Sequence, residues 1–297
     1  GLNIGPRGAA GTPDGLIALV TKAEQIGFAS VGLPDHIVFP RQSDARYPYR
    51  ADGKHPSNVT GYALDQLACL AWIAGQTSTI RVGTSVILVP QRNPLYTAKE
   101  VANVDWLSGG RFDFGIGVGW QREEFTAPGA PFVGRTARLE DQVRACRALW
   151  EQAPPVSFES ATVAFEDLWC EPRPLQPRVP IWFGGDASSR TAERIAALGD
   201  GWLPVGVAPD AVLVEGIANL RNACAQVGRD PSTIGVRAGL PVALDAAGRV
   251  DLGATRARAE ELGALGVTTV SVALGRFLAG PADVRPFLAD LGAAFAA

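Results

Sequence analysis

The chain has 297 residues, of which 47% are hydrophobic and 19% are charged, and its formal net charge is −3. This composition is typical of a well-packed globular protein, and the lack of a basic surplus argues against a nucleic acid or a membrane surface as a partner. The two histidines and four cysteines do not have the spacing of a metal or redox site, so we expect no bound metal. No signal peptide and no apolar stretch of membrane-spanning length are visible, so we expect a cytoplasmic protein.

Strand and helix patterns alternate along the first half of the chain. Helices are predicted where apolar residues recur every three to four positions, and strands where short apolar runs end in glycine or proline. In chain order, strands are expected at residues 2–6, 30–33, 80–86 and 111–117, and helices at residues 14–27, 62–76, 93–107 and 138–150. Each strand is followed by a helix, which is the order expected of parallel neighbours.

The alternation breaks at residues 153–178 and then resumes. This segment is rich in proline, and Val156, Phe158, Val163 and Phe165 lie at alternate positions, which predicts an inserted β-hairpin. Beyond it, strands are expected at 180–183, 201–205, 234–240 and 267–274, and helices at 188–198, 210–227, 252–265 and 282–294. Eight strands, each followed by a helix, predict an α/β protein with a closed (β/α)8 TIM barrel, and an open doubly wound sheet is the alternative. No linker divides the chain, so residues 1–297 are expected to form a single domain.

In a barrel of this kind the active site lies at the carboxyl ends of the strands. The second predicted strand is followed by Asp35 and His36. Histidine exchanges protons near neutral pH, so the pair is a candidate acid or base, although a loop pair bound to the backbone would look the same. A long polar loop, residues 35–60, follows, and its Tyr47 and Tyr49 could belong to a lid over a substrate.

The fourth strand runs into a glycine-rich turn. Gly115, Gly117 and Gly119 form a G-x-G-x-G pattern, and Trp120 comes next. The dinucleotide fingerprint is G-x-G-x-x-G leading directly into a helix, so a Rossmann site is not expected here. We interpret Gly117 and Gly119 as a crowded strand end beside a flat cofactor ring, with Trp120 packing on that ring or covering the barrel.

A second glycine loop follows the fifth strand. Gly184 and Gly185 precede Ser188, where a helix is predicted to begin. Backbone N–H groups at a helix amino terminus bind anions, and glycines let a ligand come close. An ordinary helix cap at Ser188, without a ligand, is the alternative. We interpret the loop as a phosphate site.

Four segments, taken in order and spacing, resemble the bacterial-luciferase-like superfamily of flavin and deazaflavin oxidoreductases. They read GLPDHIVFP, IRVGTSVILVPQRNP, LSGGRFDFGIGVGW and PIWFGGDASSRTAERIAALGDGWLP. The resemblance covers nearly the whole chain and looks closest to the branch that uses coenzyme F420, a deazaflavin with a phosphate and a glutamate tail. It implies a barrel with an insertion, an oxidoreductase activity and a homodimer.

The resemblance also implies roles for particular residues. A non-proline cis peptide between Ser85 and Val86, at the end of the third strand, would back the ring of the cofactor. Asp35 would be the acidic residue near the deazaflavin, and His36 would be the catalytic acid or base, oriented or tuned by Asp35. Gly184, Gly185 and Ser188 would bind the phosphate.

One position departs from the family pattern. In the sugar-phosphate dehydrogenase of this family, a glutamate that supplies a proton follows the glycines of the fourth strand. Arg122 stands there in this chain, with Glu123 and Glu124 just beyond. The departure argues against the same sugar-phosphate substrate and leaves a second proton donor open.

The sequence therefore predicts a coenzyme F420-dependent oxidoreductase that transfers hydride to or from a small organic substrate. Two alternatives stay open: an FMN-dependent luciferase-like monooxygenase that uses oxygen, and a flavin-binding barrel without turnover. A Schiff-base aldolase is disfavoured because Lys22, Lys54 and Lys99 lie on predicted helices or in the long loop. A metal-dependent hydrolase is disfavoured because two histidines are too few.

Overall fold

Eight parallel strands close into a barrel in the computed structural model, which describes residues 1–5, 8–41, 43, 45–48, 52–53, 63–247, 250–274 and 284–295. The strands are β1 (Leu2–Asn3), β2 (Ser30–Leu33), β3 (Arg81–Thr84), β5 (Phe112–Gly117), β8 (Ile181–Gly184), β9 (Gly201–Leu203), β10 (Gly235–Gly239) and β11 (Thr269–Ala273). Each pairs in parallel with the next, and β11 pairs back with β1. The predicted TIM barrel is confirmed, and the open sheet is excluded because the ring of strands is closed.

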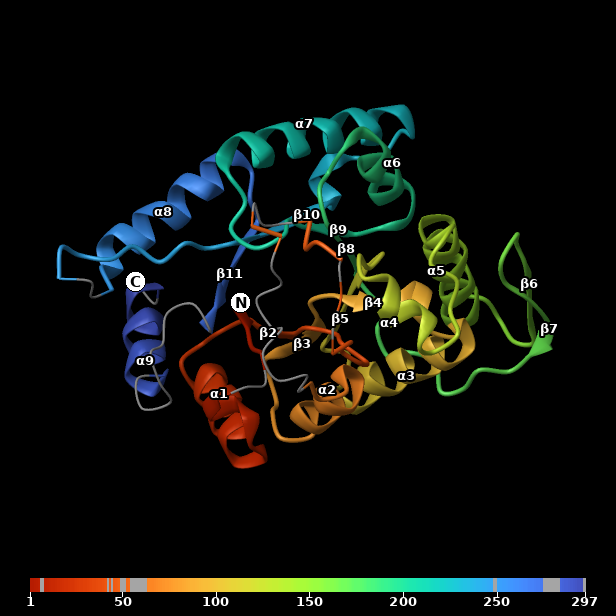
Figure 1. The fold of residues 1–297 in the computed structure, drawn as a ribbon, viewed down its shortest axis with the longest axis horizontal. Coiled ribbons are helices and arrows are strands. Elements are labelled where there is room, and N and C mark those ends of the chain that lie inside the picture. Colours follow the sequence, from red (N-terminus) through yellow and green to blue (C-terminus); the bar gives the residue numbers. More distant parts are fainter. Residues whose placement is uncertain are drawn as a thin grey trace.

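Helices cover the outside of the barrel and alternate with its strands (Figure 1). They are α1 (Pro13–Gln25), α2 (Gln66–Ala74), α3 (Pro94–Leu107), α5 (Arg135–Glu151), α6 (Ser189–Leu198), α7 (Asp210–Gln226), α8 (Leu252–Leu265) and α9 (Val284–Phe295). Local sequence sets their ends. The Asn93 side chain caps α3, and Pro94 stands in its first turn. The helix predicted from residue 62, which lies outside the described residues, begins at Gln66 because the Asp65 side chain accepts the Ala68 N–H and caps it there.

The apolar core lies between strands and helices, whereas the inside of the barrel is polar at its amino end. Asp113 on β5 accepts hydrogen bonds from Arg81 (Nε to Oδ1, 2.9 Å) and Arg237 (Nη2 to Oδ2, 2.8 Å). The Arg237 guanidinium lies over the Trp182 ring, 4.3 Å from its centroid. A Cβ on Gly201 would come within 2.1 Å of that ring, so this glycine makes room for the indole. These side chains fill the amino end and leave the carboxyl end for a ligand.

The predicted insertion is present as an antiparallel hairpin of β6 (Val156–Glu159) and β7 (Ala164–Leu168). The rings of Phe158 and Phe165 stack across it, 5.8 Å between centroids. The hairpin projects from the side of the barrel, beyond α5 (Figure 1). The segment that follows the hairpin is hydrogen-bonded to α3: Gln176 Nε2 donates to Asp105 Oδ1 at 2.6 Å.

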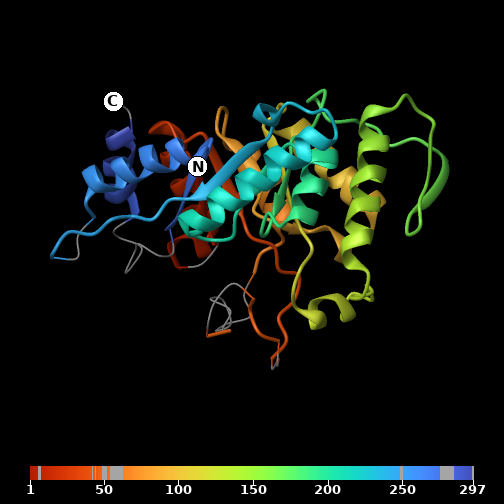
Figure 2. The ribbon, with the colours of Figure 1, turned by 90° about the horizontal axis from the view of Figure 1, so that it is seen from above.

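The structure also contains short elements that the periodic patterns do not predict. They are β4 (Ile87–Leu88), α4 (Arg122–Thr126) and the 3-10 helices η1 (Gly8–Gly11), η2 (Val89–Gln91) and η3 (Pro231–Thr233). β4 pairs with the end of β5, so it extends the sheet at the carboxyl end of the barrel. Figure 2 shows α4 and the described part of the long loop extending from the same side of the barrel. In the part of the chain that the structure describes, no helix combines the length and apolarity needed to cross a membrane.

Candidate active site

The Val86 side chain lies between the carboxyl ends of β5 and β8. The peptide bond between Ser85 and Val86 is cis, which confirms the prediction. A Cβ on Gly117 would lie 2.6 Å from Val86 Cγ2, and a Cβ on Gly184 would lie 2.6 Å from Val86 Cγ1, distances that real Cβ atoms do not show. Both glycines therefore make room for Val86 itself. The space that the sequence interpretation gave to a ring beside Gly117 holds this side chain, and contact of the two glycines with a cofactor stays a prediction.

Phe125 and the long loop shape the turn after β5. Gly119 has a φ of +72°, and a Cβ there would lie 2.7 Å from Phe125 Cε2, so both the conformation and the space require glycine. Trp120 is half-buried and meets the Tyr47 ring edge-on, 5.3 Å between centroids. Trp120 thus contacts the long loop, and its packing on a cofactor ring stays a prediction. Tyr49 lies outside the described residues.

Asp35, two residues after β2, is buried, and both of its carboxylate oxygens have partners. Oδ2 accepts a hydrogen bond from the Leu88 N–H of β4 at 2.9 Å, and Oδ1 accepts one from Arg92 Nη2 at 2.8 Å. Hydrogen bonds from an arginine to a carboxylate are among the stronger ones in proteins. The Asp35 carboxylate therefore links the segment after β2 to the segment around β4 by hydrogen bonds.

The carboxylate that contacts His36 is Glu124 on α4, 88 residues away in the chain. His36 Nδ1 lies 2.7 Å from Glu124 Oε1, and the Glu124 side chain has no exposed surface. Glu124 Oε2 has no hydrogen-bond partner among the described residues. The expectation that Asp35 orients His36 is corrected, because the two neighbouring side chains contact different elements: Asp35 the β4 segment, and His36 the helix α4.

Glu124 is the candidate residue that sequence patterns do not single out. Helix α4 has five residues, so no apolar period marks which of its side chains is buried. The available signal is its position, since it follows a glycine turn at a strand end by a few residues. A buried carboxylate needs a hydrogen-bond partner, but the sequence alone does not say which residue supplies it.

Glu123, the preceding residue, binds the long loop. Ser43 Oγ donates to Glu123 Oε1 at 2.8 Å, and the Ala45 N–H donates to the same Oγ at 3.0 Å. With the contact between Tyr47 and Trp120, these bonds tie the loop to α4 and the turn before it. Two consecutive glutamates of α4 therefore hold two different parts of the segment that follows β2.

The loop between β8 and α6 is fixed by a hydrogen bond from Trp202 and has open space beside Gly185. Trp202 Nε1 donates to Gly185 O at 2.9 Å. Gly185 has a φ of +128°, and a Cβ there would meet no atom within 4 Å. Ser188 stands at the N-cap position of α6, but its hydroxyl lies 3.2 Å from the Thr191 hydroxyl and does not cap the helix. The first turn of α6 has no side-chain cap, which fits an anion-binding role.

Arg122 on α4 is exposed and lies over an aromatic ring. Its guanidinium carbon is 4.6 Å from the centroid of Phe132, and that of Arg135 is 4.1 Å from the same centroid. Arg135 Nε also donates to Gly119 O at 3.0 Å. The position where the resemblance implies a proton-donating glutamate therefore carries a cation, and the buried carboxylate of this helix is Glu124.

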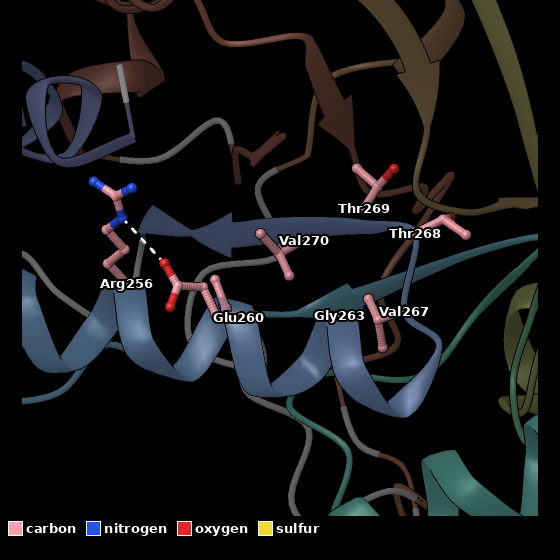
Figure 3. A pocket seen from close by; sticks show the side chains of 8 residues that line it. Arg256, Glu260, Gly263, Val267, Thr268, Thr269 and Val270 are labelled. Carbon is pink, nitrogen blue, oxygen red and sulfur yellow. Dashed lines mark hydrogen bonds and ion pairs between the residues drawn. The ribbon is translucent and has the colours of Figure 1, made fainter. Parts of the chain in front are cut away.

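A groove outside the barrel lies at the opposite end from His36. It has a volume of about 360 Å³ and lies between α8 and β11 (Figure 3). The residues that line it are Arg256, Ala259, Glu260, Gly263, Val267, Thr268, Thr269 and Val270. Its one acidic and one basic side chain pair with each other at 3.2 Å. The groove meets the amino end of β11, so it is separate from the candidate site. Within the described ranges, no cluster of three or more His, Cys, Asp or Glu residues could hold a metal ion.

Comparison with known proteins identifies relatives of this barrel. A family model described as luciferase-like monooxygenase matches residues 3–265. An uncharacterized protein of Mycobacterium tuberculosis is 32% identical over 225 residues, which is 75% of this chain and 76% of that protein. An F420-dependent glucose-6-phosphate dehydrogenase of Kineococcus radiotolerans is 34% identical over 197 residues, which is 64% of this chain and 52% of that protein.

A solved structure shares the fold over the whole chain. The monooxygenase RslO1 from Streptomyces bottropensis superposes with a TM-score of 0.78 at 21% identity, covering 99% of this chain and 98% of that one. The family-model match spans His36, the Ser85–Val86 peptide, Glu124 and the loop at Gly185. The chain belongs to the luciferase-like monooxygenase family and is an enzyme of the flavin- or deazaflavin-dependent oxidoreductase kind.

Proposed function

We propose that this protein uses coenzyme F420 to move a hydride to or from a small organic substrate at the carboxyl end of the barrel. The observation that carries the proposal is the adjacency of the Val86 segment and the His36 segment. Ser85 N–H donates to Leu33 O at 2.8 Å, and the Asp35 carboxylate accepts a backbone N–H of β4. A surface suited to a flat ring and a proton-exchanging side chain therefore lie just after two neighbouring strands, β3 and β2.

The residues present fit the phosphate and the ring of a deazaflavin. The open turn at Gly185 and the uncapped first turn of α6, with the Ser188 hydroxyl beside it, supply donors and space for a phosphate. Ser85 and Val86 would support the ring, and Trp120 would cover it together with Tyr47. When bound, the cofactor supplies a ring carbon that accepts or releases hydride, and that chemistry belongs to the cofactor.

The chain itself contributes a proton and positioning. Hydride transfer to or from a small organic substrate is accompanied by the gain or loss of a proton, which a histidine exchanges near neutral pH. His36 would do this at Nε2, the ring nitrogen that Glu124 does not engage. The loop that Glu123 and Trp120 hold against the barrel would exclude water from the substrate.

A monooxygenase that uses FMN and oxygen is the second candidate. The likeness to the monooxygenase RslO1 over nearly the whole chain favours it. We prefer F420 because the dehydrogenase that is 34% identical depends on F420, although this chain spans only about half of that protein's length. A non-catalytic flavin-binding barrel is disfavoured by the buried pair of Glu124 and His36, since burying such a pair is costly and does little for stability. The homodimer expected from the resemblance is part of the same proposal, and light scattering measures it.

A turnover screen tests the proposal. Oxidised F420 is mixed with a panel of small alcohols, reduced F420 with carbonyl and unsaturated compounds, and the absorbance of the oxidised cofactor is followed. We expect turnover in one of these series and a loss of about 10²–10⁴-fold in kcat for His36→Ala, with cofactor binding retained. Oxygen consumption with reduced FMN, without any reaction of F420, would select the monooxygenase instead.

A further inference from the structure

Glu124 is a buried carboxylate whose described hydrogen bond goes to His36. We infer that Glu124 is the positioning residue of His36: it accepts a hydrogen bond from Nδ1–H and so keeps Nε2 as the nitrogen that exchanges a proton with the substrate. The catalytic half of this inference rests on the proposed function. Its structural half, which ring nitrogen carries the proton, is testable without any cofactor.

The distance and the chemistry of the two groups place the proton on Nδ1. The 2.7 Å between Nδ1 and Oε1 lies in the range of a charge-assisted hydrogen bond. An ionised carboxylate only accepts hydrogen bonds, and imidazole is the stronger base of the two groups. Nδ1 is therefore the donor, and a neutral His36 presents an unprotonated Nε2. An unprotonated imidazole nitrogen can accept a proton.

Among the described residues, no carboxylate other than that of Glu124 accepts a hydrogen bond from His36 Nδ1. Both oxygens of Asp35, the acidic neighbour of His36 in sequence, are used by the Leu88 N–H and by Arg92. Glu123 accepts from Ser43. Because Glu124 Oε2 has no described partner, the hydrogen bond to His36 is the contact that compensates the burial of this carboxylate. The orientation of His36 and the burial of Glu124 therefore depend on each other.

Packing of the next residue fixes Glu124 in place. The Phe125 side chain is fully buried, lies against the space left by Gly119 and meets Phe132 edge-on at 5.3 Å between centroids. The carbonyl oxygen of Phe125 accepts the Ala130 N–H at 2.8 Å, which closes the end of α4. A short helix held in this way can present a carboxylate at a fixed place, as a positioning residue requires.

Nitrogen NMR of the histidine rings tests the inference on the full chain without cofactor. The sequence has two histidines, so a His55→Asn background leaves His36 as the single imidazole. With 15N-labelled histidine, the shifts and ring couplings distinguish a protonated from an unprotonated nitrogen. Spectra are recorded over a series of pH values, and the tautomer is read where a single ring nitrogen carries a proton. The variants Glu124→Gln and Glu123→Gln change the same charge at consecutive positions of α4, so the second is the matched control.

We expect the Nδ1–H tautomer in the wild-type background and in Glu123→Gln, and a smaller fraction of it in Glu124→Gln, because a neutral amide accepts from Nδ1–H less strongly than a carboxylate and can itself donate to Nδ1. A wild-type spectrum with the proton on Nε2, or a Glu124→Gln spectrum like the wild type, would overturn the inference. The wild-type spectrum decides even if Glu124→Gln does not fold.

Kinetics with a substrate found in the screen give an independent readout. We expect kcat to fall about tenfold or more in Glu124→Gln with little change in KM, and to recover in part in Glu124→Asp. Glu123→Gln should leave the tautomer in place and act on KM, because its bond is to the loop. A kcat in Glu124→Gln equal to the wild-type value would contradict the catalytic half. Failure to find any F420 turnover would count against the proposed function and leave the tautomer result standing.

Discussion

The Val86 side chain occupies the place that a Cβ atom on Gly184 would need, 2.6 Å from its Cγ1. Gly184 ends β8, whereas Val86 belongs to the break between β3 and β4, so two distant parts of the chain meet at the carboxyl end of the barrel. The shape of this part of the site therefore depends on a packing contact within the protein.

Replacing Gly184 by alanine should displace Val86. The added methyl group would overlap with Val86 Cγ1, and overpacking of this kind costs about 1–3 kcal/mol of folding free energy. We expect a lower free energy of unfolding in urea and weaker cofactor binding. Gly263→Ala is the control, because a Cβ at that position of α8 meets no atom within 4 Å. Unchanged cofactor affinity in a folded Gly184→Ala protein would show that Val86 does not shape the binding surface.

Replacing Asp35 by asparagine should affect stability and not the tautomer of His36. The change removes the buried carboxylate of the largely buried Arg92 and leaves it only the exposed Asp65, 4.0 Å away. Breaking a buried pair costs about 3–5 kcal/mol. We expect this loss in urea unfolding, while the nitrogen NMR signals of His36 keep the wild-type pattern. A change of tautomer in Asp35→Asn would restore Asp35 as the residue that orients His36.

Glu24 on α1 should make stability depend on pH. Its Oε1 accepts the N–H groups of Ser78, Thr79 and Ile80 at 2.8, 2.6 and 2.9 Å. Burial of the carboxyl raises its pKa, but these hydrogen bonds outweigh burial and lower the pKa from 4.5 to about 2. Because the folded-state pKa lies below the ordinary value, the stabilisation is full above pH 4.5 and is lost as the pH falls towards 2.

The corresponding experiment is urea unfolding of Glu24→Gln and wild type at a series of pH values. We expect the variant to be less stable at neutral pH and the difference to shrink as the pH falls from 4.5 towards 2. Glu215→Gln, an exposed position on α7, is the charge-matched control. A difference between Glu24→Gln and wild type that does not depend on pH would contradict the role of these hydrogen bonds.

Asp113 should contribute to stability without affecting the site. Asp113→Asn leaves Arg81 and Arg237 without the buried carboxylate between them, with an expected loss of about 3–5 kcal/mol in urea unfolding. Since this network fills the amino end of the barrel, the folded variant should bind cofactor as the wild type does. Weaker cofactor binding by folded Asp113→Asn would show that the two ends of the barrel are coupled.

Local signals predicted most of the element boundaries to within about two residues. The strand expected at residues 30–33 and the helix expected at residues 252–265 match β2 and α8 residue for residue. Pro34 follows the strand directly, and Gly266, with a φ of +105°, follows the helix. The strand expected at residues 201–205 ends at Leu203, because proline follows and cannot donate to the sheet.

Features that depend on distant contacts could not be predicted in the same way. β4 and α4 are too short for any period to mark them. The contact between His36 and Glu124 spans 88 residues, so no local pattern reports it. The sequence suggested Asp35 as the partner of His36 because the two are neighbours, but Asp35 accepts from Leu88 and Arg92, whereas His36 contacts Glu124. The cis peptide at Ser85–Val86 was predicted through the family resemblance, since periodicity carries no information on the isomer.

Equilibrium binding of oxidised F420 and of FMN to the purified protein, followed by quenching of tryptophan fluorescence, tests the central claim most directly. The two cofactors share a flat ring system and a phosphate, so the comparison isolates the choice between them. The account predicts saturable binding of F420 that is at least about tenfold tighter than that of FMN, a difference of about 1.4 kcal/mol. Tight binding of FMN with no binding of F420 would contradict it.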